Sequence, residues 1–215
     1  MSAPARAFTP RHVQLLRALF AAAAAVMITF SPDHSAAVGL SVFSGFVLTT
    51  GLILILAAWL VFPAGQRWPS AVLALLGVAA GMAAGVPPWR TDDLFFVVLI
   101  AWSASTGAVE LIAGLRARRT GDPAARDSIT VGAFGLLLAV VLLAIPAGFV
   151  QPYAIDGAGD FILTGIILGV GMFGGYAAVV AVFLGIAGLT PTRADAVAAT
   201  TSDDAPAPID HGGER

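Results

Sequence analysis

The side chains that could do chemistry in this 215-residue sequence are few and lie far apart. The three histidines, His12, His34 and His211, fall in polar segments at wide separations, so their spacing does not suggest a metal site. Cysteine is absent, which excludes disulfides, thiolate nucleophiles and cysteine-ligated metals. The sequence predicts no catalytic residue, no metal site and no cofactor, and we expect a protein that is not an enzyme.

Paired carboxylates occur at Asp92-Asp93 and Asp203-Asp204. The second pair lies in a segment rich in Pro, Ala and Thr, where solvated charges are the simplest interpretation. The first pair immediately precedes an apolar run, and aspartate is a favoured residue at the N-cap of a helix. We expect Asp92 or Asp93 to cap that helix.

Glu110 differs from every other acidic residue because it lies inside an apolar segment. An ionised carboxylate at membrane depth costs roughly a few kcal/mol unless it is paired. Glu110 lies about 9 Å along a helix from Arg116, at 1.5 Å per residue, and Arg17 lies at a similar depth in the first apolar run. The hypothesis is a buried pair of Glu110 with Arg17; a neutral Glu110 among small polar neighbours and a proton or ion carrier are the alternatives.

The composition indicates which solvent surrounds these residues. The chain is 58% hydrophobic and 11% charged, with a mean hydropathy of +0.90, which is more apolar surface than a water-soluble domain of this size can cover. We predict an all-α membrane protein with a polar N-terminal segment at residues 1 to 12, no strands, and a disordered tail at residues 190 to 215. The predicted spans are residues 13 to 30, 36 to 62, 70 to 86, 94 to 115, 129 to 150 and 161 to 189.

Arginine predicts the topology, since lysine does not occur. Ten of the eleven arginines fall in the two terminal segments and in the loops on the same side, whereas the opposite loops hold only Arg90. The positive-inside rule then places both termini in the cytoplasm. The basic start and Ala-rich first run also resemble a signal peptide, but the same run is the first half of a repeat.

Two features recur along the chain. Odd spans end at an outer proline, Pro32, Pro87 or Pro146, and even spans carry a pair of small residues near mid-helix, Thr50-Gly51, Thr106-Gly107 and Gly174-Gly175. Because each unit starts and finishes on the predicted cytoplasmic side, the pattern predicts three parallel helical-hairpin repeats.

The second unit contains W-x(4)-G-x-x-E-L-I-A-G-L-R-x-R from Trp102 to Arg118. This motif, with the outer proline and the six spans, resembles the HdeD-like family of short-repeat bacterial membrane proteins. The resemblance implies a multi-pass protein of the bacterial plasma membrane with a part in acid or envelope stress tolerance, and no catalytic residue or cofactor. The first and third units carry Leu54 and Ala178 at the register of Glu110, so the resemblance assigns no shared role to this acid.

Small residues predict how the helices pack in lipid, where apolar burial does not drive association. Gly77, Gly81 and Gly85 form one face of the third span, and Gly51, Gly107 and Gly175 lie in the even spans. We favour contacts within the chain, with a homo-oligomer or a membrane-protein partner as the alternative, and no nucleic acid. Three functions are open: a non-catalytic HdeD-type envelope protein, a small proton, ion or solute transporter that uses Glu110, and an accessory subunit of a larger membrane complex.

Overall fold

The computed structural model describes residues 8 to 190 apart from positions 123, 147 and 158. The helices, each long and apolar enough to cross a membrane, are α1 (Pro10–Phe30), α2 (Ala36–Leu60), α3 (Trp68–Gly85), α4 (Asp92–Arg119), α5 (Ala125–Ala144) and α6 (Gly165–Leu189). They confirm the predicted six-helix, all-α membrane class. The tail predicted to be disordered lies, from residue 191 onward, outside the described residues.

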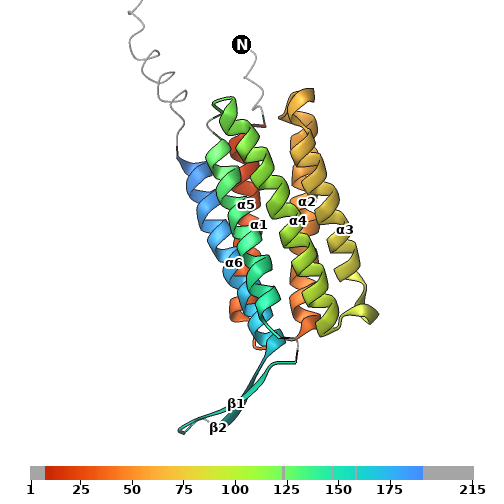
Figure 1. Cartoon of the computed structure of the whole chain (residues 1–215), viewed down its shortest axis with the longest axis vertical. Helices are drawn as coiled ribbons and strands as arrows, with labels where there is room; N and C mark the ends of the chain where they lie inside the picture. Colours follow the sequence, from red (N-terminus) through yellow and green to blue (C-terminus); the bar gives the residue numbers. More distant parts are fainter. Residues whose placement is uncertain (1–7, 123, 147, 158, 191–215) are drawn as a thin grey trace, which may run out of the picture.

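The six helices run alternately up and down and close into a ring (Figure 1). Each helix packs against its neighbours in the chain, and α6 returns to pack against α1. The most extensive contacts join α4 with α5, α1 with α6, and α2 with α3. The two helices of each predicted hairpin repeat (α1 with α2, α3 with α4, α5 with α6) pack less extensively against each other. Each of the most extensive contacts therefore joins two neighbouring repeats. The repeat itself stays a prediction.

Glycines bring the backbones of α4 and α5 together. A Cβ atom added at Gly132 would lie 2.6 Å from the backbone nitrogen of Leu111, and one added at Gly107 would lie 2.8 Å from the carbonyl oxygen of Gly132. Gly135 faces Gly107 on the same contact, with an added Cβ 3.1 Å from its Cα. Without a side chain on either helix, backbone atoms meet directly and gain dispersion contacts that lipid cannot replace.

The predicted glycine face of α3 packs against α2 of the same chain. An added Cβ would lie 3.1 Å from Val47 O at Gly77, 2.6 Å from Leu48 Cγ at Gly81, and 3.3 Å from Ser44 Oγ at Gly85. Ser44 Oγ also donates a 2.8 Å hydrogen bond to Gly81 O. On α2, Gly51 faces Val78 at 3.2 Å. These contacts are within the chain, as the sequence favoured.

Gly175 does not pack as predicted. It is exposed, and an added Cβ would have nothing within 4 Å, whereas one at Gly174 would lie 2.7 Å from Ile28 Cγ2 on α1. Successive helical residues are rotated by about 100°, so only one of two adjacent glycines can face a given neighbour. Gly174 is therefore the residue of α6 that plays the part of Gly51 and Gly107.

The loop between α5 and α6 contains strands, contrary to the sequence prediction of none. β1 (Val150–Ile155) pairs with β2 (Gly159–Thr164) in an antiparallel hairpin whose register runs from Val150↔Thr164 to Ile155↔Gly159. Gly157 and Gly159 have φ of +81° and +100°, a region that favours glycine and allows the tight reversal. The fifth span ends at Ala144 instead of residue 150, because proline at 146 removes a backbone donor and disfavours helical geometry at Ile145.

Both ends of α4 also differ from the prediction. α4 continues to Arg119, so its last-turn arginines, which include Arg116, are helical and lie where the helix dipole favours positive charge. The N-cap of α4 is Thr91, whose Oγ1 accepts a 3.2 Å hydrogen bond from Leu94 N, while Asp92 and Asp93 occupy its first turn. Threonine's hydroxyl satisfies the free amide, and the two carboxylates add a favourable dipole interaction.

Arginine side chains link the ends of neighbouring helices by hydrogen bonds. Arg11 Nε donates to Gly188 O and so ties the start of α1 to the end of α6. Arg90, the arginine predicted on the opposite side, donates from Nε to Ala84 O at 3.2 Å and from Nη1 to Ser41 Oγ at 2.7 Å. The carbonyls of Gly188 and Ala84, near the C-terminal ends of α6 and α3, accept two of these bonds, and the Ser41 hydroxyl of α2 accepts the third.

Replacement of Gly132 by alanine tests the glycine contact. The new methyl group would meet backbone atoms of α4, which cannot move without separating the two helices, so we expect the free energy of unfolding to fall by about 1–3 kcal/mol. Gly175→Ala is the matched control, because its methyl group enters open space. Loss of helical circular dichroism in detergent micelles, driven by heat or sodium dodecyl sulfate, measures both; equal losses would contradict the packing account.

Candidate functional site

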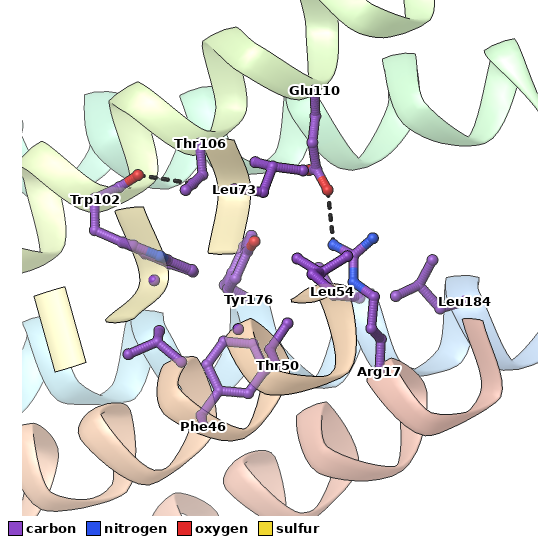
Figure 2. Close-up of a pocket in the computed structure, with 14 residues that line it drawn as sticks. Arg17, Phe46, Thr50, Leu54, Leu73, Trp102, Thr106, Glu110, Tyr176 and Leu184 are labelled. Carbon is purple, nitrogen blue, oxygen red and sulfur yellow. Dashed lines mark hydrogen bonds and ion pairs between the residues drawn. The ribbon is translucent and has the colours of Figure 1, made fainter. Parts of the chain in front are cut away.

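Arg17 and Glu110 form an ion pair inside the bundle. Arg17 Nη2 lies 2.7 Å from Glu110 Oε1, and the two side chains are 20% and 9% exposed (Figure 2). This is the pair that the sequence hypothesis named, and it joins α1 to α4 across 93 positions of the chain. No other salt bridge occurs among the described residues.

Helical spacing explains why both side chains point inward. Glu110 follows Trp102, Ser103, Thr106 and Gly107 on the buried face of α4, at the three- and four-residue intervals that keep side chains on one side of a helix. Arg17 lies one turn after Val13 and one turn before Ala21 on the buried face of α1. Either charge alone would be costly at this depth, so each supplies the counter-charge that the other needs.

The pair is held by one hydrogen bond. In the described part of the chain Arg17 donates only to Glu110 Oε1, and neither Glu110 Oε2 nor the remaining guanidinium N–H groups have a protein partner. A guanidinium can bind a carboxylate with two parallel hydrogen bonds, so half of that capacity is unused here. Both residues line the two cavities described below, and these remaining groups are what a small polar molecule could bind.

A cavity of about 430 Å³ lies between the pair and the end of the bundle where α1 begins. We call it the vestibule. Its floor is made by Arg17, Glu110, Leu54 and Leu184, and its rim by exposed residues of the loops and helix ends, namely Gln66, Trp68, Arg116, Thr120 and Asp122. Binding sites for small molecules are commonly concave, mostly apolar and about 300–1,000 Å³ in volume, and the vestibule has this character.

Two side-chain contacts fix the walls of the vestibule. Gln14 Nε2 donates a 3.0 Å hydrogen bond to Asp127 Oδ2 and so links α1 with α5. The guanidinium carbon of Arg116 lies 5.3 Å from the centre of the Trp68 ring, a cation–π contact between α4 and α3. All four residues line the vestibule. These pairs could not be predicted from the sequence, because their members come from helices whose proximity the sequence does not indicate.

A second, smaller cavity lies on the other side of the ion pair. This inner pocket has a volume of about 30 Å³, room for one or two water molecules. Its polar lining comes from Thr50, Thr106 and Tyr176 together with the pair (Figure 2). Thr106 Oγ1 donates to Trp102 O at 2.7 Å, whereas Thr50 Oγ1 is buried and has no hydrogen-bond partner among the described residues.

The predicted repeat contains a signal for Thr50 that the sequence analysis did not use. Thr50 and Thr106 each precede a packing glycine, Gly51 and Gly107, and both line the inner pocket. In the predicted repeat, Leu54 of the first unit occupies the position that Glu110 occupies in the second. Leu54 borders both cavities. One threonine from each of two helices therefore faces the same small space.

Aromatic rings close the bundle beyond the inner pocket. Phe43, Phe46, Trp102 and Phe173 form this aromatic closure, with neighbouring ring centroids 5.1–6.0 Å apart. Phe43 and Phe173 are fully buried. Each ring lies nearer the β-hairpin than the polar pocket residue of its own helix. The polar path that begins at the vestibule therefore ends at these rings.

Comparison with protein-family models, curated proteins and solved structures finds no match to this chain. The HdeD-like resemblance therefore stays a prediction. Among the described residues no group of three or more His, Asp or Glu side chains is placed to hold a metal ion. The arrangement offers charge pairing and hydrogen bonding inside a largely apolar cavity, which is the chemistry of reversible binding.

A double-mutant cycle tests the pair. We expect Arg17→Leu and Glu110→Leu each to lower the free energy of unfolding by about 3 kcal/mol, because each leaves a buried charge without its partner. The double variant removes both charges, so it should lose at least about 1 kcal/mol less than the sum of the single variants. Unfolding in detergent micelles gives the three values. A folded Arg17→Leu protein beside an unfolded Glu110→Leu protein would show that Glu110 has another partner.

Proposed function

We propose that this chain is a membrane carrier for a small organic solute that bears at least one charged group, and that the Arg17–Glu110 pair is the solute-binding site. The observation that carries the proposal is the position of the pair. It forms the floor of a cavity that opens at one end of the bundle, and it separates that cavity from an inner pocket closed by aromatic rings. A carrier in one of its two states has one accessible and one closed side around a central site.

The ion pair suits a site that must open and close. A solute carboxylate can bind Arg17 and a solute ammonium can bind Glu110. A singly charged solute that separated the two would leave one of them without a counter-charge, so it must bind beside the intact pair. A zwitterionic solute could satisfy both residues. The hydrogen-bonding groups that the 2.7 Å contact leaves free give such a solute a first point of attachment.

The size and lining of the vestibule favour an organic solute. A cavity of about 430 Å³ is much larger than a proton or small-ion path needs. Its walls include Val13, Leu73 and Val131, which can contact the apolar part of a solute, while the charged groups gather at the floor and rim. The size and lining of the vestibule therefore favour a transporter of an organic solute over a transporter of protons.

Charge distribution supports an orientation for the carrier. The vestibule opens at the end where α1 begins and α6 finishes, and seven of the eight arginines among the described residues belong to segments on that side. With the termini in the cytoplasm of a bacterium, the vestibule would face the cytoplasm and the β-hairpin would face outward. The part in acid or envelope stress tolerance and the accessory-subunit role stay predictions.

Binding to defined solutes tests the proposal. We expect one class from a panel of free amino acids, monocarboxylates and primary amines to raise the melting temperature of the purified protein by several degrees, because a ligand stabilises the state that it binds. Glu110→Gln should abolish this shift. Asp93→Asn is the matched control, since it neutralises an exposed carboxylate at the opposite end of the bundle. Uptake of the stabilising solute into proteoliposomes should show the same dependence.

Two outcomes would contradict the solute carrier. Equal shifts in the wild type and Glu110→Gln would place binding away from the pair. Proton flux into protein-containing liposomes at outer pH 4, lost in Glu110→Gln and unaffected by any panel solute, would show that the pair is a proton path. The two assays thus distinguish the solute and proton forms of the transporter.

A further inference from the structure

The β-hairpin between α5 and α6 exposes apolar side chains with no protein cover. Val150, Tyr153, Ile155, Phe161 and Ile162 are all between 41% and 59% exposed. An isolated two-stranded hairpin is at best marginally stable in water, and contiguous exposed apolar surface usually marks an interaction site. A further surface is therefore expected to cover this hairpin.

The direction of the hairpin indicates where that surface lies. In Figure 1 the two strands leave the lower end of the bundle beside α6 and run obliquely downward and to the left, away from the helices and past the edge of the bundle. Their roots are the ends of two membrane-spanning helices, and Gly165 N, at the start of α6, donates a 2.9 Å hydrogen bond to Phe149 O. A hairpin of six-residue strands is about 20 Å long, so its turn lies well away from the helices that it connects.

In the half of the hairpin next to the turn, the two faces differ in polarity. Tyr153 pairs directly with Phe161, and their rings stack with centroids 5.6 Å apart and planes 24° apart. Ile155 lies on the same face, because alternate residues of a strand share a side. Ala154 pairs with Asp160 on the opposite face. Near the turn, one face is therefore aromatic and aliphatic and the other carries a carboxylate. Val150 and Ile162 lie on the face of Asp160, nearer the helices.

Charge favours a lipid surface of low net charge as the occupant. Between residues 145 and 165 the charged residues are Asp156 and Asp160, both near the turn, and there is no basic residue. Anionic headgroups would be repelled, not attracted, by this segment. Tyrosine and other aromatic residues are enriched at the level of the headgroups, where a ring contacts acyl chains and a hydroxyl contacts water.

We propose that the β-hairpin is an in-plane membrane anchor: it lies on the zwitterionic lipid surface at its end of the bundle, with the Tyr153–Phe161 face in the headgroup region and the Asp160 face in water. The anchor rests on the hairpin alone and does not depend on the proposed carrier function. It gives α5 and α6 a shared attachment to the interface beyond their own spans.

The absence of cysteine allows a direct test. Single-cysteine variants Tyr153→Cys and Ile155→Cys report the proposed lipid face, and Ala154→Cys and Asp160→Cys report the opposite face. Each carries a nitroxide label in phosphatidylcholine vesicles, and power saturation compares collisions with oxygen, which concentrates in lipid, and with a water-soluble nickel chelate. Leu137→Cys, on the exposed surface of α5, calibrates the lipid value.

We expect the labels at 153 and 155 to collide at least about threefold more with oxygen relative to nickel than those at 154 and 160. Adding an anionic phosphatidylglycerol should not increase this ratio. Equal access of nickel to all four positions would overturn the proposal, because the hairpin would then stand in water. Spin–spin broadening at 153 that disappears on dilution with unlabelled protein would also overturn it, since a second copy of the chain would then cover the face.

Discussion

Two opposite charges in a solvent that cannot hydrate them are the constraint on which this bundle depends. Arg17 and Glu110 lie on helices separated by two others in the chain, so the ring must close with the right rotation of both α1 and α4 before the charges can meet. Their 2.7 Å contact specifies that rotation, because turning either helix by one residue would carry its charge toward lipid. The cavities on either side of the pair are a consequence: long polar side chains in a small-residue bundle leave space that apolar side chains do not fill.

Different side chains hold the helices together at the periphery and at the centre of the bundle. Between α4 and α5, and between α2 and α3, glycines let the backbones touch, whereas the centre of the bundle is filled by large aromatic rings. The periphery is therefore tightly packed and the centre holds both the aromatic closure and the polar path. A bundle of this kind can rearrange its interior side chains while the close helix pairs move as units, which is the mechanical requirement of the proposed carrier.

Much of the fold could be predicted because hydropathy, helix length and proline report directly on membrane depth. The ion pair could be predicted for the same reason, since a buried charge at a known depth has few available partners. The order of neighbours around the ring, the vestibule and the pairing of Gln14 with Asp127 could not, because they depend on which faces of distant helices meet. Gly174 was missed in favour of Gly175 since the two differ only in rotation about α6. The strands were missed because short apolar runs beside a proline fit a helix end as well as a hairpin.

The closure of the ring by α6 against α1 has a consequence for synthesis. The helix that packs most extensively on α1 is α6, which is made after the other five, and Arg11 can reach Gly188 only when the final turn of α6 exists. Glu110 also emerges 93 residues after Arg17. During insertion α1 must therefore wait in lipid with its arginine extended toward the interface, where a long side chain can reach water. The helix α1 enters the membrane before its main partner exists and completes its packing only when α6 has been made.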